Sequence, residues 1–242
     1  MKKIINNNFW KTRAENYNKT SWVKDDHLLN AYLSLIPKNN IYKNILEVGI
    51  GTGVVANKVV DMIGPMIGLD KSKEMMSKID HDGITKVVGD AHDLPFDDNH
   101  FDLIYMRNVI HYLENPAIVF AEILRCLKNE SIYLLSQVIP FSDEISDEYD
   151  ELIGRDIHYP NHGEIKDFFS DYIIMDEVEY VLEAQSIMNW LNNTCENDAK
   201  KQLIIDKHKN TSNTYKRMVN YKEENDDIFV DIKHLFVLAE KH

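Results

Sequence analysis

The first 140 residues alternate between short apolar runs and segments whose apolar positions recur every three or four residues. The runs are typical of strands and occupy residues 45–48, 65–69, 84–88, 101–106 and 132–138. The segments with helical spacing occupy residues 25–36, 54–62, 72–79 and a stretch that begins at Pro116. Asn115 suits a helix N-cap, and proline suits the first helical position that follows it. This alternation predicts a parallel sheet covered by helices.

After Pro140 the spacing becomes less regular. Residues 172–182 and 228–239 alternate as strands do, and a mostly helical segment lies between them. Two strands without a regular crossover helix favour an antiparallel edge beside the parallel strands. We therefore expect a single domain over residues 1–242 with an α/β fold. It has a seven-stranded, mostly parallel sheet, an antiparallel edge strand and a helical cap.

Charge and cysteine content exclude several classes of protein. The chain has 27 Lys and Arg against 40 Asp and Glu, and its net charge of −13 repels phosphate backbones. Cys126 and Cys195 are too few for a disulfide framework or a zinc site. Polar residues interrupt the first segment where a signal peptide would need an apolar run, and no later run approaches a membrane span. We expect a cytoplasmic protein with no nucleic acid or membrane partner.

A glycine-rich turn follows the first strand directly. In an open α/β sheet, ligands bind beyond the carboxyl ends of the strands, where strand order reverses. Glycines there let the backbone approach a ligand, and the next helix presents its N–H groups to an anionic group. The dinucleotide fingerprint G-x-G-x-x-G requires glycine where Val54 stands, and an acid, Glu47, precedes the turn. The turn therefore favours an anionic ligand group, whereas an NAD site is disfavoured.

Acidic residues end the next two strands. Asp70 ends the second strand, where its carboxylate can accept hydrogen bonds from both hydroxyls of a ribose. Asp90 ends the third strand, within reach of an adenine amino group. The chain has no P-loop lysine. These features predict a nucleoside with a short charged tail and not a triphosphate.

Four segments in this order resemble the successive motifs of class I S-adenosylmethionine-dependent methyltransferases. They are LEVGIGTG at 46–53, GLD at 68–70, GDAHDLPF at 89–96, and FDLI at 101–104 followed by VIHYL at 109–113. The resemblance covers roughly residues 41–140 and is closest to the small-molecule group that includes the ubiquinone and menaquinone biosynthesis enzymes. It implies a Rossmann-like sheet, S-adenosylmethionine as cofactor and S-adenosylhomocysteine as product. It also implies an N-terminal helical segment (1–40), a cofactor-binding core (41–140) and a substrate-side segment (141–242).

The resemblance implies which parts of the chain hold the cofactor. The glycine loop would hold the methionine part, Asp70 the ribose, and Asp90 with its neighbours the adenine. Arg107 would offer its backbone to the methionine part, and the N-terminal segment would close over the cofactor. The expected cofactor-binding residues are Arg13, Tyr17, Glu47, Gly49, Gly51, Gly53, Asp70, Lys71, Met75, Asp90, Ala91 and Arg107.

Titratable residues also lie at the rim where an acceptor would enter. His111 follows the fourth strand, and its neutral imidazole could take a proton from a nucleophile, so it is the candidate catalytic residue. A role in shape or local hydrogen bonding is the simpler interpretation. His158, Tyr159 and His162 either line the acceptor pocket or form a polar turn. The basic residues within 186–222 form either a solvated face or a cover for an anionic acceptor.

The predicted function is methyl transfer from S-adenosylmethionine to a small-molecule acceptor by direct displacement. Aligning the acceptor and excluding water account for most of such catalysis, so no catalytic triad or metal is expected. Two other classes stay open at this point. One is a nucleotide-dependent oxidoreductase, and the other is a catalytically silent cofactor-binding module without an enclosed acceptor pocket. The acceptor atom and the oligomeric state are left open by the sequence.

Overall fold

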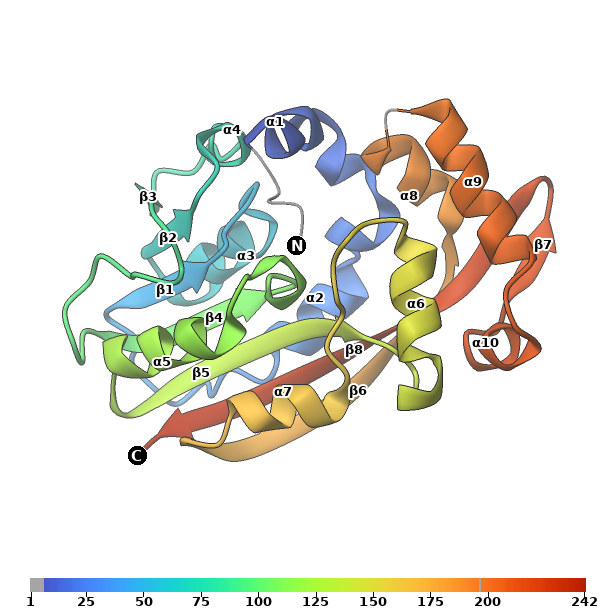
Figure 1. Cartoon of the computed structure of the whole chain (residues 1–242). Coiled ribbons are helices and arrows are strands. Elements are labelled where there is room, and N and C mark those ends of the chain that lie inside the picture. Colours follow the sequence, from blue (N-terminus) through green and yellow to red (C-terminus); the bar gives the residue numbers. More distant parts are fainter. Residues whose placement is uncertain (1–6, 196) are drawn as a thin grey trace.

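The computed structural model describes residues 7–195 and 197–242, and its centre is one mixed sheet (Figure 1). The sheet runs in the order β3-β2-β1-β4-β5-β8-β6, and β7 pairs with β8. The strands are β1 (Ile45–Val48), β2 (Met66–Asp70), β3 (Ile84–Val88), β4 (Phe101–Arg107), β5 (Leu127–Ile139), β6 (Tyr172–Ser186), β7 (Lys222–Glu224) and β8 (Asp227–Lys241). The first five are parallel, and β8 is antiparallel to both β5 and β6. The expected fold class is confirmed, with β8 lying one strand in from the edge.

Helices cover both faces of the sheet. Behind it in Figure 1 lie α2 (Asp26–Leu33) and α3 (Val54–Ile63), whose apolar residues share one buried cluster with the sheet. In front lie α5 (Pro116–Cys126) and α7 (His162–Phe168), which contribute to a second cluster. Every residue of β1 is buried, as expected for a parallel strand with helices on both sides. Since β1 pairs with β2 on one side and β4 on the other, the strand order reverses there and leaves a crevice beyond its end.

A helical cap lies beyond the carboxyl ends of the strands. It contains α6 (Ser146–Ile153), α8 (Ile187–Thr194), α9 (Asp198–Lys209) and α10 (Asn213–Met218), whose buried residues form a third cluster with the start of β8. The N-terminal helix α1 (Asn7–Asn16) and two short 3-10 helices (Tyr17–Lys19 and Ser21–Lys24) complete this side. The cap was expected, but the strand β7 within this segment was not. Its turn uses Asn225 and Asp226 at positive φ, as tight hairpins do.

One local prediction needs correction. The helix expected at 72–79 is the single turn α4 (Lys73–Met76), and the chain turns away after Ser77.

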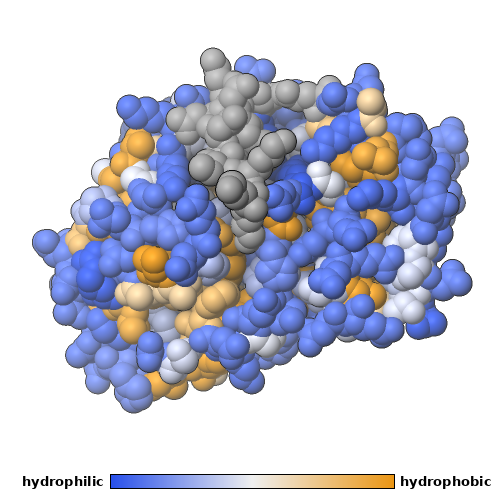
Figure 2. Space-filling model, in the orientation of Figure 1, coloured by the Kyte–Doolittle hydropathy of each residue, from blue (hydrophilic) through white to orange (hydrophobic). Residues whose placement is uncertain are grey.

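The face visible in Figure 2 is mostly hydrophilic with scattered apolar patches. Within the described residues, no helix combines the length and apolar character that crossing a membrane requires.

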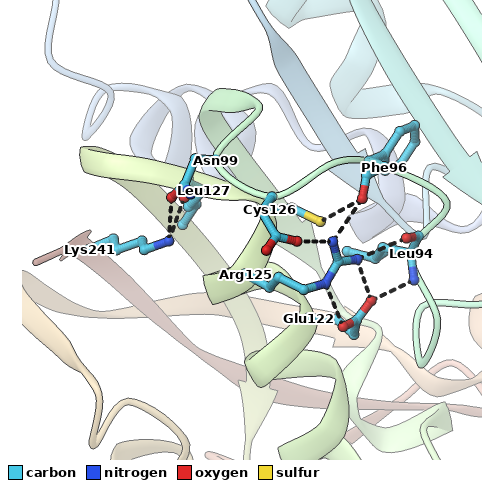
Figure 3. Close-up of polar contacts among 9 residues, drawn as sticks. Leu94, Phe96, Asn99, Glu122, Arg125, Cys126, Leu127 and Lys241 are labelled. Carbon is cyan, nitrogen blue, oxygen red and sulfur yellow. Dashed lines mark hydrogen bonds and ion pairs between the residues drawn. The ribbon is translucent and has the colours of Figure 1, made fainter.

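The loop between β3 and β4 is fastened to α5 (Figure 3). The Arg125 guanidinium donates to the carbonyl oxygens of Leu94 (3.0 Å) and Phe96 (2.8 Å). The Glu122 carboxylate accepts from the Leu94 N–H at 2.9 Å and also pairs with Arg125. The same loop begins with the Gly89-Asp90 motif, so this clamp positions one side of the crevice.

Candidate functional site

A cavity of about 270 Å³ opens where the first four strands end. Most of the predicted cofactor-binding residues line it, although they come from well-separated parts of the sequence. Those that line it are Tyr17, Glu47, Gly49, Gly51, Asp70, Lys71, Met75, Asp90, Ala91 and Arg107, and the rim residue His111 joins them. Gly53 and Arg13 are not among the lining residues.

The glycine loop has a backbone that requires glycine. The N–H groups of Gly49 and Ile50 both donate to the carbonyl oxygen of Leu69, at 2.8 and 3.0 Å. Gly49 has φ +75°, and an added Cβ would lie 2.4 Å from the Val109 side chain. Gly51 has φ +55°, and a Cβ added there would lie 3.5 Å from the end of the Met75 side chain. The loop therefore leaves a cradle that a side chain would fill.

Gly53 has a packing role instead. It is the N-cap of α3 at φ +76°, and a Cβ there would lie 2.9 Å from Ile79. Its role as a cofactor-binding residue stays a prediction.

Asp70 is held rigidly at the end of β2. One carboxylate oxygen accepts from the Gly51 N–H and the other from the Ser72 N–H, both at 2.8 Å. Burial raises the pKa of Asp70, and these N–H donors oppose that rise. The Lys71 N–H acts in the same direction, and a carboxylate can accept about four hydrogen bonds in all. The residue can therefore still accept from a ligand hydroxyl while it fixes the glycine loop.

Asp90 is engaged by its own neighbours. Its carboxylate lies 2.8 Å from Lys71 Nζ and 2.8 Å from His92 Nδ1, and it accepts from the His92 N–H at 3.0 Å. Burial alone would raise its pKa, but these donors outweigh burial and lower it to about 2. The carboxylate is thus ionised, and it orders Lys71 and His92 at the cavity wall.

Glu47 and Arg107 form the polar floor of the cavity. Glu47 is 3% exposed and accepts from the Tyr105 hydroxyl at 3.1 Å. Burial raises the pKa of Glu47 well above its ordinary value. The Arg107 guanidinium donates to the carbonyl oxygens of Trp22 and Val23, at 3.2 and 3.1 Å. Its side chain thus fastens the N-terminal segment beside the cavity.

His111 is packed and hydrogen-bonded. Its ring stacks on Tyr159 with centroids 4.3 Å apart, and its Nδ1 accepts from the Gln137 side-chain amide at 3.0 Å. Burial, with the positive charges of Arg155 and Arg13, lowers its pKa well below the ordinary value. A neutral ring with Nδ1 as acceptor carries its proton on Nε2. In this arrangement His111 donates from Nε2 and has no free lone pair for a proton.

A second cavity of about 90 Å³ adjoins the first, beneath the helical cap. Tyr17, Asn108, His111 and Tyr112 line both cavities. Arg13 lines the second cavity, and its guanidinium donates to the Tyr112 hydroxyl at 3.1 Å. The role of Arg13 as a cofactor-binding residue stays a prediction.

The sequence left open whether His158, Tyr159 and His162 line the acceptor pocket, and the structure separates Tyr159 from the two histidines. Tyr159 lines the second cavity. His158 instead pairs with Asp150 at 2.7 Å and with Glu164 at 3.0 Å, and His162 pairs with Glu177 at 2.7 Å. The two histidines are not among the residues that line either cavity.

Asn108, Tyr112 and Arg155 are among the lining residues that the sequence did not single out. Asn108 adopts φ +55° after β4, and its side chain accepts from the Val138 N–H at 2.9 Å. An asparagine directly after a strand is a usable signal for such a turn. Tyr112 stands next to His111 in the VIHYL motif at 109–113, and that position is the signal that could have identified it as a lining residue. Arg155 follows α6 in an irregular segment, where no pattern distinguishes it.

Comparison with known proteins gives a consistent result. The family described as "Methyltransferase domain" matches residues 46–135. An uncharacterised protein of Methanocaldococcus jannaschii is 36% identical over 118 residues, which are 48% of this chain and 54% of that protein. Demethylmenaquinone methyltransferase of Staphylococcus carnosus is 36% identical over 92 residues, 34% of this chain and 38% of that protein.

YcgJ of Bacillus subtilis is similar both in sequence and in structure. Described as an uncharacterised methyltransferase, it is 30% identical over 125 residues, which are 49% of this chain and 49% of that protein. Its crystal structure matches with a TM-score of 0.77 and 18% identity, covering 90% of this chain and 99% of that one. At that identity the structural likeness shows the fold alone.

These findings confirm the resemblance drawn from the motifs. Residues 46–135 are thus similar to the methyltransferase domain family, and two of the relatives that the chain matches are named methyltransferases. The chain spans about half the length of the first curated relatives it matches. Its acceptor, its site residues and the activity of the whole protein are therefore matters for proposal.

Proposed function

We propose that this protein transfers a methyl group from S-adenosylmethionine to a small-molecule acceptor. The observation that carries the proposal is the geometry at Asp70. Its carboxylate fixes the glycine loop through the Gly51 N–H and also lines the cavity. A rigid bidentate acceptor beside a glycine cradle fits a nucleoside with a short charged tail.

The cavity lining supports a division of roles. In our proposal, Gly49, Gly51 and Glu47 surround the methionine part, with Arg107 offering its backbone nearby. Asp70 accepts from the ribose hydroxyls. Lys71, Met75, Asp90 and Ala91 surround the adenine, and Tyr17 closes the cavity from the N-terminal segment. Gly53 acts indirectly, since it lets α3 pack against Ile79.

The second cavity supports catalysis over a silent binding role. A scaffold that only binds the cofactor needs no enclosed space between the rim and the cap, yet a cavity lies there and shares His111 and Tyr112 with the first. When bound, the cofactor supplies a methyl group activated by positive sulfur. The side chains that line both cavities would align the acceptor and exclude water, which is the main contribution such a displacement needs. The reaction we propose is metal-independent.

Electrons and protons balance simply in this reaction. A lone pair of the acceptor forms the bond to the methyl carbon, and the pair of the breaking carbon–sulfur bond stays on sulfur. An anionic acceptor requires no base, whereas a neutral acceptor also releases a proton. We assign that proton to His111, which can take it only after the Gln137 amide turns and presents its oxygen to an Nδ1–H.

The domain division and the cytoplasmic location given above stay predictions.

The test is a calorimetric titration of the wild-type protein with S-adenosylhomocysteine and, separately, with NADH. We expect S-adenosylhomocysteine to bind with one site and a micromolar Kd, on the order of −8 kcal/mol, and NADH to bind at least about a hundredfold more weakly. Tighter binding of NADH would overturn the proposal in favour of a nucleotide-dependent oxidoreductase.

A further inference from the structure

The second cavity combines aromatic walls with two cationic side chains. Trp22, Tyr149, Tyr159, Trp190 and Tyr215 contribute to its walls, and the guanidinium groups of Arg13 and Arg155 also line it. Among the described residues of this lining, the acidic one is Asp231, whose carboxylate already accepts from the Ala184 N–H at 2.8 Å. The described residues of the lining thus carry more positive than negative charge, in a chain whose net charge is −13.

The two arginines reach the cavity from distant parts of the chain. Arg13 comes from α1, is 7% exposed and donates to the Tyr112 hydroxyl. Arg155 follows α6, and its guanidinium carbon lies 5.6 Å from the centre of the Trp190 ring. Both side chains are held by aromatic neighbours, so their orientation is set before a ligand arrives.

Neighbouring groups respond to this positive charge. Burial lowers the pKa of Arg155, and the positive charge of Arg13 lowers it further, as expected for two cations in one pocket. Burial would raise the pKa of Tyr112, yet Arg13 and Arg155 outweigh burial and leave that pKa below its ordinary value. The pocket therefore favours a negative charge on whatever enters it.

We propose that the second cavity binds the acceptor and selects a small aromatic carboxylate, whose charge is met by Arg13 and Arg155. This inference rests on the proposed methyl transfer. Guanidinium groups match the planar geometry of a carboxylate, and the ring would pack against Tyr159 and Trp190. At about 90 Å³ the cavity suits a compound of about one ring, whose far end would extend past His111 toward the larger cavity.

The test uses benzoate and benzamide as probes, because they have nearly the same shape and differ in charge. Each is titrated by calorimetry into the wild-type protein, first alone and then saturated with S-adenosylhomocysteine. We expect benzoate to bind at least about tenfold more tightly than benzamide in both conditions. Equal affinities, or no binding of benzoate to protein that binds S-adenosylhomocysteine, would overturn the inference. Failure to bind S-adenosylhomocysteine would instead overturn the proposed function.

Variants assign the effect to the cavity. Arg155→Met is expected to weaken benzoate binding at least about tenfold, and Arg155→Lys less, while S-adenosylhomocysteine affinity is retained. The matched control is Arg217→Met, which removes an exposed arginine of α10 outside the lining and should leave benzoate affinity unchanged. Wild-type benzoate affinity in a folded Arg155→Met protein would overturn the inference. If that variant does not fold, the comparison of benzoate with benzamide on the wild type still decides.

Discussion

Replacing Asp70 with alanine should weaken S-adenosylhomocysteine binding strongly. The substitution removes the carboxylate that we assign to two ribose hydroxyls, and hydrogen bonds to a charged group contribute about 1.5 to 3 kcal/mol each. It also removes the acceptors of the Gly51 and Ser72 N–H groups, so the loop loses its fixed shape. Water that enters the site of the variant restores part of the lost binding free energy. We expect a net loss of about 3 kcal/mol, or roughly a hundredfold in Kd.

The assay is calorimetry with S-adenosylhomocysteine on matched variants. Asp97→Ala serves as the control, because Asp97 is an exposed acid in the loop before β4 and does not line the cavity. Asp70→Asn keeps the shape and one acceptor oxygen, so its loss should lie between those of Asp97→Ala and Asp70→Ala. Wild-type affinity in a folded Asp70→Ala protein would refute the assignment of this carboxylate to the ligand.

Three further variants test the scaffold. Gly49→Ala should lower the free energy of unfolding in urea by about 2 to 4 kcal/mol, because its φ is +75° and its Cβ would press on Val109; an unchanged midpoint would contradict this. Arg125→Ala should lower the free energy of unfolding by about 1 to 2 kcal/mol and speed amide hydrogen exchange in the 94–98 loop, because the Arg125 guanidinium binds the carbonyl oxygens of Leu94 and Phe96. Unchanged exchange would show that these hydrogen bonds do not hold the loop. Burial, together with the charge of Arg107, lowers the pKa of His234 to about 3, so the unfolded chain binds an extra proton between about pH 6.5 and 3. The resulting contribution to stability is complete above about pH 6.5 and is lost, by up to about 1.4 kcal/mol per pH unit, as the pH falls toward 3. The free energy of unfolding in guanidinium should therefore fall less between pH 7.5 and pH 4.5 in His234→Phe than in the wild type. Exposed His27→Phe should show the wild-type fall. An equal fall in the two variants would contradict this prediction.

The parallel core could be predicted from sequence because its elements are locally determined. A strand such as β1 is wholly apolar apart from Glu47, and the adjacent glycine turn has few alternative structures. The helix expected after Asp70 is shorter than predicted because the chain turns after Ser77, and the spacing of apolar residues did not indicate that turn. The strand β7 has three exposed, charged residues, so its pairing with β8 gave no hydrophobic signal.

The site divides along the same line. Residues that follow strand ends, such as Asp70 and Asp90, were predictable because parallel strands bring their carboxyl ends to one edge. The second cavity was not, since it brings together Arg13 from the first helix, Arg155 from an irregular segment and Trp190 from the cap. Trp190 belongs to the buried cluster of the cap. Only the tertiary arrangement adds its second role as a cavity wall.

The most direct test is a crystal structure of the wild-type protein grown with S-adenosylhomocysteine. We predict density for the nucleoside in the larger cavity, with both ribose hydroxyls within hydrogen-bond distance of the Asp70 carboxylate and the sulfur on the side of His111. A crevice left empty at saturating ligand, or a ligand bound with its ribose away from Asp70, would contradict the proposed site.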